Sequence, residues 1–205
     1  MDEPVSFGHE TAGPAPISPA QPYCQYPIGV LADRAALTIT TMQKYMPAVQ
    51  VGMIDAISGY GGAVSASTLA QDITGFITAL NAKMQTYRPG FAVQYFHADT
   101  NWTNPSWLSL METTSAAINS LGVPFGVVIG GSPTDTTDTA WASDALSRLS
   151  LILNDPKITL SAVVAQSWQA LPTNMLPEAT AGTQTNILLQ AQQMVATAPL
   201  AAGFR

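Results

Sequence analysis

Short apolar segments alternate with longer segments of helical periodicity along most of the chain. Four of the short segments are rich in β-branched and aromatic residues and nearly continuous in hydrophobicity, as is typical of parallel strands covered on both faces. Strands that alternate with helices in this way predict parallel βα units. The predicted strands are residues 49–54, 91–96, 125–129 and 160–166.

The spacing of apolar residues in the longer segments predicts about five helices. In STLAQDITGFITALNAKM, for example, Leu69, Ile73 and Leu80 fall on one face of a helix. Gly122 stands where a C-terminal cap would end another helix. The predicted helices are residues 31–46, 67–84, 104–121, 137–154 and 183–196.

Each predicted helix except the first follows a predicted strand. We therefore expect residues 1–4, MDEP, to be the C-terminal tip of a fourth strand whose body is missing, together with the strands before it. Residues 13–29 contain PAPISPAQPYCQYP and are predicted to form a long Pro-rich βα loop. Long loops of this kind are often functional.

Two architectures join parallel strands by crossover helices, an open doubly wound sheet and a (β/α)8 barrel. No Gly-rich dinucleotide-binding motif follows a predicted strand, because GYGG at residues 59–62 has the wrong spacing. We therefore expect an α/β fold in which residues 1–205 form one domain, the C-terminal part of a (β/α)8 TIM-type barrel. This partial barrel would contain about five parallel βα units, extending to about residue 196.

The composition argues against several classes of protein. The net charge is −6 and the 7 basic residues are scattered singly, so the chain offers no basic face to nucleic acid. The longest apolar runs are broken by Gly and Pro, which predicts no membrane span. Cys24 is the single cysteine, which excludes an internal disulfide. The abundance of Thr, Ser and Gln favours an extracellular or periplasmic parent protein, although this chain carries no signal peptide.

Functional groups of a barrel lie where strands end and βα loops begin. Acidic residues stand at three of the five predicted strand ends, in a chain that is poor in charge. We therefore expect a site on one rim of the sheet. The strand ends carry Asp2 and Glu3 in MDEP, Asp55 in GMIDAIS, His97 and Asp99 in YFHADTNW, Gly130 and Gly131 in VVIGGS, and Trp168 in AQSWQALP.

Several of these segments resemble a known family. MDEPVSFGH, VQVGMIDAIS, QYFHADTNW, LGVPFGVVIGG and AQSWQALPTNMLPE together are similar to the C-terminal part of bacterial (β/α)8 proteins related to glycoside hydrolases. Glu3-Pro4 resembles the Asn-Glu-Pro at the fourth strand end of many retaining glycosidases, where the Glu is the acid/base. This chain differs from that pattern in two places. Asp2 replaces the Asn, and the strand that ends at Gly130-Gly131 lacks the carboxylate that serves as nucleophile in that family.

The chemistry of glycoside cleavage also points to paired acids. A protonated carboxyl must donate to the leaving oxygen, and a second, ionised carboxylate must act as nucleophile or base. Two acids on one rim can supply both states, because like charges push their pKa values apart. Glu3 is our candidate for the acid, with Asp55 or Asp99 as its partner.

Other residues near the strand ends are candidates for binding the substrate. Trp168 would present an apolar face to a sugar ring, and Trp102 and Tyr60 would be outer platforms. Asp2 and His97 complete the predicted substrate-binding residues.

The role of His97 leaves three alternatives open. The histidine could be an orienting or hydrogen-bonded residue, it could be catalytic, or it could bind a hydrolytic metal together with Asp55 and Asp99. One histidine is few compared with the usual zinc sites. We therefore predict no metal and no cofactor.

Two hypotheses of function follow. The first is a carbohydrate-active hydrolase domain, similar to glycoside hydrolases, that uses a carboxylate pair on the rim. The alternative is a noncatalytic sugar-binding or structural barrel, which the missing carboxylate after Gly130-Gly131 favours. The expected partner is a carbohydrate, and the isolated chain could self-associate through unpaired sheet edges.

Overall fold

The structure of this chain is a computed structural model that describes residues 1, 4–8, 26–57 and 65–198. These residues form an α/β fold around a parallel sheet of four strands in the order β1-β2-β3-β4. The strands are β1 (Met53–Ala56), β2 (Phe96–Asp99), β3 (Phe125–Ile129) and β4 (Ala162–Ala165). The helices are α1 (Pro4–Gly8), α2 (Ile28–Gln43), α3 (Ala66–Gln85), α4 (Trp107–Ser120), α5 (Asp138–Leu153) and α6 (Gln184–Thr197).

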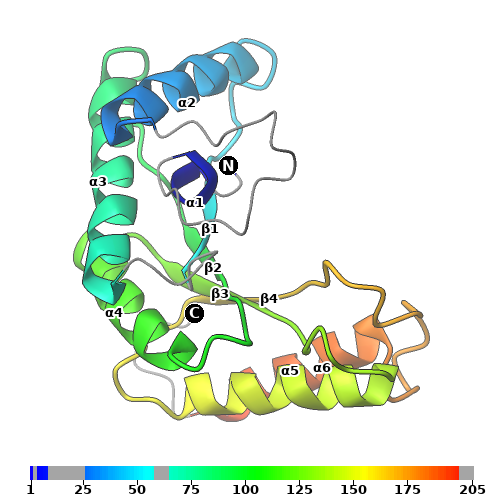
Figure 1. The fold of residues 1–205 in the computed structure, drawn as a ribbon. Helices are drawn as coiled ribbons and strands as arrows, with labels where there is room; N and C mark the ends of the chain where they lie inside the picture. Colours follow the sequence, from blue (N-terminus) through cyan, green and yellow to red (C-terminus); the bar gives the residue numbers. More distant parts are fainter. Residues whose placement is uncertain (2–3, 9–25, 58–64, 199–205) are drawn as a thin grey trace, which may run out of the picture.

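A long helix follows every strand of the sheet, so β1 to β4 belong to successive βα units (Figure 1). The helices α3 to α6 lie along one side of the sheet, and the other side of the sheet faces the concave side of the molecule. The parallel, sequential strand order confirms the prediction from the sequence.

The strand register divides the side chains between two faces of the sheet, because successive residues of a strand point to opposite sides. Phe96 pairs with Met53 and Phe125, and all three side chains are fully buried. The next residue, His97, pairs with Ile54 and Gly126 and lies on the other face. We call this second face the open face, and its partly or largely exposed members are Ile54, Tyr95, His97, Asp99, Ala162 and Val164.

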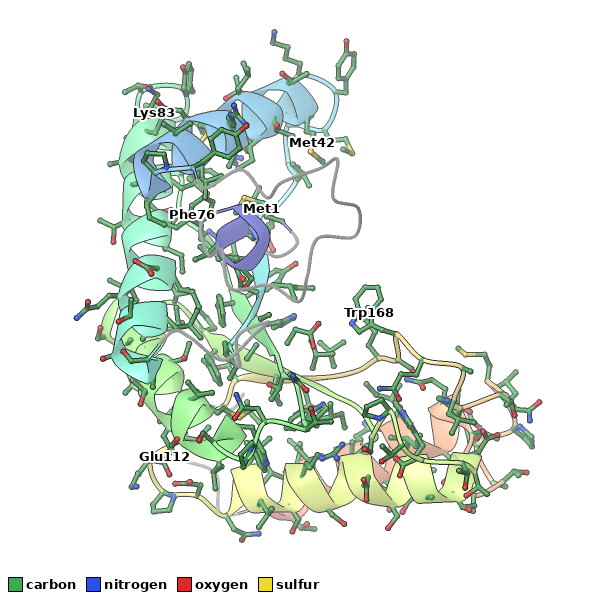
Figure 2. All side chains as sticks on the ribbon, viewed as in Figure 1. Met1, Met42, Phe76, Lys83, Glu112 and Trp168 are labelled. Atoms are coloured by element: carbon green, nitrogen blue, oxygen red, sulfur yellow. The ribbon has the colours of Figure 1, made fainter. Side chains whose placement is uncertain are left out.

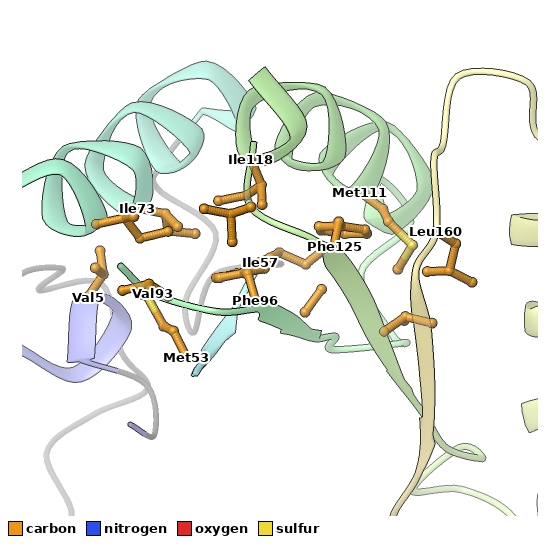
Figure 3. Close-up of a cluster of buried hydrophobic side chains, with 14 of the residues drawn as sticks. Val5, Met53, Ile57, Ile73, Val93, Phe96, Met111, Ile118, Phe125 and Leu160 are labelled. Carbon is orange, nitrogen blue, oxygen red and sulfur yellow. The ribbon is translucent and has the colours of Figure 1, made fainter. Parts of the chain in front are cut away.

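The hydrophobic core lies between the helices and the first face of the sheet. Ile73 from α3 and Met111 and Ile118 from α4 pack with Phe96 and Phe125 from the strands (Figure 3). Burial of large apolar side chains such as these is the main force that holds the helices on the sheet. The apolar stripe predicted for the segment STLAQDITGFITALNAKM is the buried face of α3.

Short polar side chains begin three of the long helices. Ser65, Thr137 and Thr183 are N-caps, and each side chain accepts a hydrogen bond from a backbone N–H of the first turn, over 3.1 to 3.3 Å. Gly122 has a φ of 70° just after α4, a conformation that glycine adopts without strain. The predicted C-terminal cap is therefore confirmed.

The element bounds differ from the prediction in several places. The strands β1 and β2 begin four and five residues later than expected, because the parallel ladder starts at the pair Met53 and Phe96. Pro4 is the first residue of a short helix rather than the end of a strand. The predicted Pro-rich loop ends before Ile28, where α2 begins, and its residues 13–25 lie outside the described part of the chain.

Met1 lies beside β1 and extends its hydrogen bonding. The Met1 amino nitrogen donates to the Gly52 carbonyl over 2.9 Å, and the Ile54 N–H donates to the Met1 carbonyl over 2.8 Å. A parallel neighbour of β1 would make this pair of bonds. Among the described helices, none combines the length and the hydropathy that a membrane crossing requires.

Candidate functional site

Asp55 holds the short helix α1 on the end of β1. Its carboxylate accepts hydrogen bonds from the N–H groups of Val5 (2.8 Å), Ser6 (3.0 Å) and Ala56 (2.9 Å). The Ser6 hydroxyl also contacts Asp55 Oδ1 and lies 3.0 Å from the Ala56 carbonyl oxygen. Since Asp55 is 0% exposed, its carboxylate is a structural anchor that no substrate can touch.

Burial also changes the pKa of Asp55. Removal from water raises the pKa of this carboxyl to about 6, and the hydrogen bonds from Ser6, Val5 and Ala56 oppose the rise only in part. A strongly shifted pKa is common in active sites, but the same shift arises in any buried acid. The position of Asp55 favours the structural cause.

Asp99 lies on the opposite face of the sheet from Asp55. Asp55 is level with Ala98 in the register, and Asp99 is the next residue along β2, level with Ala56. Because side chains alternate along a strand, Asp55 is on the helix-covered face while Asp99 is on the open face. The two acids share the carboxyl end of the sheet, but the structure does not bring them together as a catalytic pair.

His97 shares the open face with Asp99. Its ring stacks against Tyr95, with centroids 4.6 Å apart and planes tilted by 30°. On the other side it fills the space over Gly126, where a Cβ atom would be 2.5 Å from His97 Cδ2. Partial burial lowers the pKa of His97 below its ordinary value, so the imidazole is neutral at pH 7. His97 is therefore held between Tyr95 and Gly126 by packing.

A small cavity lies where β2, β3 and β4 end, and it contains three of the predicted site residues. We call this cavity, of about 70 Å3, the rim cleft. Asp99 and Trp102 come from the end of β2, and Trp168 comes from the segment after β4. The remaining lining residues are Thr100, Val128, Gly130, Gly131, Trp141, Gln166, Ser167 and Gln169.

Trp102 is fixed in the rim cleft by its neighbours. It packs edge-on against Trp107, with ring centroids 5.1 Å apart and planes at 73°. The guanidinium of Arg148 lies 5.2 Å from the Trp102 ring centroid, within the range of a cation–π contact. Arg148 itself is held by a 2.7 Å hydrogen bond to the Gly130 carbonyl and by an ion pair with Asp144. The Trp102 ring is therefore preorganised.

Trp168 is the exposed aromatic residue of the rim cleft. Its side chain is 67% exposed, and it projects from the segment after β4 into the concave side of the molecule (Figure 2). The neighbouring Gln169 accepts a 2.8 Å hydrogen bond from Trp141 Nε1, which holds its side-chain amide at the cleft. An exposed indole beside fixed polar groups can stack on a ring whose hydroxyl groups bind the neighbouring amides.

Three predicted site residues lie outside the part of the chain that the structure describes. These are Asp2, Glu3 and Tyr60. Among the described residues, no group of three or more His, Cys, Asp and Glu side chains could hold a metal ion. Asp55 and His97 cannot share a metal, because they lie on opposite faces of the sheet.

The rim cleft also contains residues that the sequence did not single out for function. Trp141 lies in helix α5 and is 1% exposed in the core. Its indole also forms a wall of the cleft, because Gly131 has no side chain: a Cβ atom there would be 2.3 Å from Trp141 Cγ. In the sequence, the consecutive glycines 130–131 could have indicated that a side chain packs here, because glycine marks positions where another group approaches the backbone.

A scan against models of protein families, a search of curated proteins and a search of solved structures each found no match for this chain.

Proposed function

We propose that this chain is a saccharide-binding domain, built on the C-terminal part of a (β/α)8-type barrel, that holds its ligand in the rim cleft. The observation that carries the proposal is the exposed Trp168 beside a cleft that contains Asp99, Trp102 and Gln169. Sugars present apolar ring faces and rows of hydroxyl groups, so they are bound by aromatic faces together with carboxylates and amides. The barrel is supported by parallel strands in sequential order, each followed by a helix.

The volume of the cleft agrees with binding at a rim rather than in a deep pocket. About 70 Å3 cannot enclose a sugar ring, whose binding would therefore use the exposed face of Trp168 and place only one or two polar groups inside. Contact of this kind suits an internal part of a long polysaccharide chain. We therefore propose a polymeric or oligomeric saccharide as the ligand.

The first prediction concerns Trp168. Titration calorimetry with cello-, xylo-, chito- and manno-hexaose should detect binding of at least one oligosaccharide. Trp168→Ala should weaken it about tenfold or more, about 1.4 kcal/mol, because the stacking surface is lost. The matched control is Tyr87→Ala, which removes an exposed aromatic ring that is no part of the rim cleft. Equal affinities of the wild type and Trp168→Ala would contradict the proposal.

Hydrolysis is a second candidate function, and one observation favours it. Val5 and Ser6, which closely follow Glu3 in the sequence, are tied through Asp55 to the carboxyl end of β1. The acid pair of this proposal is Glu3 and Asp99, since Asp55 is inaccessible. Asp99 is half-buried at the cleft and would act as the nucleophile or base.

The second prediction tests this acid pair. If the chain releases reducing ends from any oligosaccharide that it binds, Glu3→Gln should lower the rate by about 100-fold or more, the usual scale of general acid catalysis. Its affinity, measured by calorimetry, should stay within about twofold of the wild type. Glu178→Gln, an exposed acid elsewhere, is the control. A wild-type chain that binds saccharide without cleaving it would leave the binding domain as the function.

A further inference from the structure

A second cavity lies at the opposite end of the sheet from the rim cleft. Its volume is about 610 Å3, within the range of about 300 to 1,000 Å3 that small-molecule sites occupy. One wall is helix α2, and the other is the segment 49–52 that leads into β1. Tyr95, which precedes β2, completes the floor. Because these segments lie before their strands, the cavity belongs to the amino end of the sheet and is separate from the saccharide site.

Helix α2 carries apolar residues on two adjacent sides: one side is buried in the core, and the other is partly buried at the edge of the core, where it lines the cavity. Ala32 and Ala36 are buried in the core, on the side that packs on α3. Leu31, Ala35 and Met42 recur at helical spacing on the side that lines the cavity, and none of them is fully buried. Because this second stripe is only partly buried, it leaves apolar surface that a ligand can cover.

The opposite wall is apolar apart from Gln50, and the floor is an aromatic ring. Val49 and Val51 line the wall, and the ring of Tyr95 forms the floor beside Gly52. Glycine is required there, because a Cβ atom on residue 52 would be 2.0 Å from the Tyr95 ring. The stacking of Tyr95 on His97 holds this ring in place. The floor is therefore rigid and already formed.

Arg34 provides the one charged side chain among the described residues that line the cavity. Its guanidinium stacks on the Tyr26 ring, 3.8 Å from the ring centroid. In the part of the chain that the structure describes, Arg34 takes part in no ion pair. A guanidinium held at the rim of an apolar cavity is suited to bind one carboxylate through two N–H donors.

We propose that this cavity binds an apolar monocarboxylate of the fatty-acid class, with the acyl chain between α2 and the segment 49–52 and the carboxylate on Arg34. The proposal follows from the charge and shape of the cavity: among the described lining residues there are two cationic groups, the Arg34 guanidinium and the Met1 ammonium, no acidic side chain, and a large apolar interior. It is independent of the saccharide site, which lies at the other end of the sheet.

The test is titration calorimetry of the full chain with decanoate, below its micelle concentration. Decanol and decyltrimethylammonium, which have the same alkyl chain with no charge or the opposite charge, are the ligand controls. Decanoate should bind at one site per chain and at least tenfold more tightly than either control. Absence of decanoate binding, or equal affinities for the three amphiphiles, would overturn the proposal.

Two variants locate the site. Arg34→Gln should lower the affinity for decanoate about tenfold and leave that for decanol unchanged. Ala35→Trp should fill the cavity and abolish the binding of decanoate and of decanol. Circular dichroism and thermal unfolding should show that the fold of this variant is intact. The matched control is Arg88→Gln, because Arg88 is an exposed arginine outside this cavity.

Light scattering on Ala35→Trp distinguishes a ligand site from an interface between copies. The oligomeric state should equal that of the wild type. If the substitution changes the oligomeric state, or if decanoate binds equally to wild type, Arg34→Gln and Ala35→Trp, the cavity is not a fatty-acid site.

Discussion

Asp55 shows how the same residue can fit a catalytic pattern and serve the fold. It stands at a strand end, as a catalytic acid of a barrel would, yet the donors of Val5, Ser6 and Ala56 occupy its carboxylate. The Ser6 hydroxyl faces two acceptors, Asp55 Oδ1 and the Ala56 carbonyl, but has one hydrogen to donate. The hydroxyl can therefore donate to only one of them at a time. Every hydrogen bond to Asp55 favours the ionised carboxylate, so the raised pKa comes from burial.

The third prediction is a dependence of stability on pH that comes from Asp55. The folded protein holds a proton on Asp55 up to a pKa of about 6, whereas the unfolded chain releases it near 3.8. The free energy of unfolding should therefore fall as the pH rises between these values, and stay level above about pH 7. The decrease from about pH 4 to about pH 7 should be about 2 kcal/mol.

The measurement is urea unfolding of the wild type and of Asp55→Asn at a series of pH values. Asparagine carries no titrating proton, so the difference between the two free energies isolates Asp55 from His97. His97 acts in the opposite direction, because its lowered pKa makes stability rise with pH up to about 6.5. A difference that does not change with pH would show that Asp55 is ionised in the folded protein throughout this range.

At the scale of helices and strands, the sequence predicted the elements better than their register. The five long helices were predictable because each buries a stripe at helical spacing, as Ile73 and Phe76 do in α3. The first residues of β1 and β2 could not be predicted, because residues 49–52 and 91–95 are as apolar as the strands that they precede. Hydrogen bonding to the neighbouring strand, which decides the bounds, is a property of tertiary structure.

The same limit applies to the candidate site. The sequence could place Asp55 and Asp99 at strand ends, but a shift of one residue in a strand moves a side chain to the other face. The structure places Asp99, Trp102 and Trp168 at one cleft and Asp55 under α1. Trp141 could not be assigned to the site from its helical spacing, because the same indole serves both the core and the cleft.

The fourth prediction concerns the contact between the end of β3 and helix α5. Gly131→Ala would place a Cβ atom 2.3 Å from Trp141 Cγ, and the buried indole has little room to move. The substitution should lower the free energy of unfolding by about 1 to 3 kcal/mol, as is usual for overpacking. It should also weaken saccharide binding, because Trp141 holds Gln169 at the cleft.

Gly29→Ala is the control for this substitution. It adds the same methyl group in helix α2 at a position where no other atom lies within 4 Å. Alanine has the higher helix propensity, so stability should stay level or rise by up to about 1 kcal/mol. If Gly131→Ala behaves like Gly29→Ala in chemical unfolding, the packing of Trp141 against the end of β3 is looser than the structure indicates.

For the whole molecule, the two faces of the sheet are in different environments. Parallel sheets are normally covered on both faces. Here the helices α3 to α6 lie along one side, and the open face carries partly exposed residues such as Ile54 and Val164. Tyr95, on the same face, is 38% exposed. A second copy of the chain can cover such a face, since burial of apolar area is favourable by about 25 cal/mol per Å2.

The fifth prediction is that the chain of residues 1–205 self-associates through the open face. Size-exclusion chromatography with light scattering should give a mass above the 21.5 kDa of one chain at concentrations of about 10 μM and higher. Val164→Lys should return the protein to a monomer, because a charge on the open face would have to be buried in the assembly. Leu151→Lys is the control, since Leu151 is an exposed apolar residue of α5. A monodisperse monomer at every concentration, with cooperative unfolding, would show that the open face needs no partner.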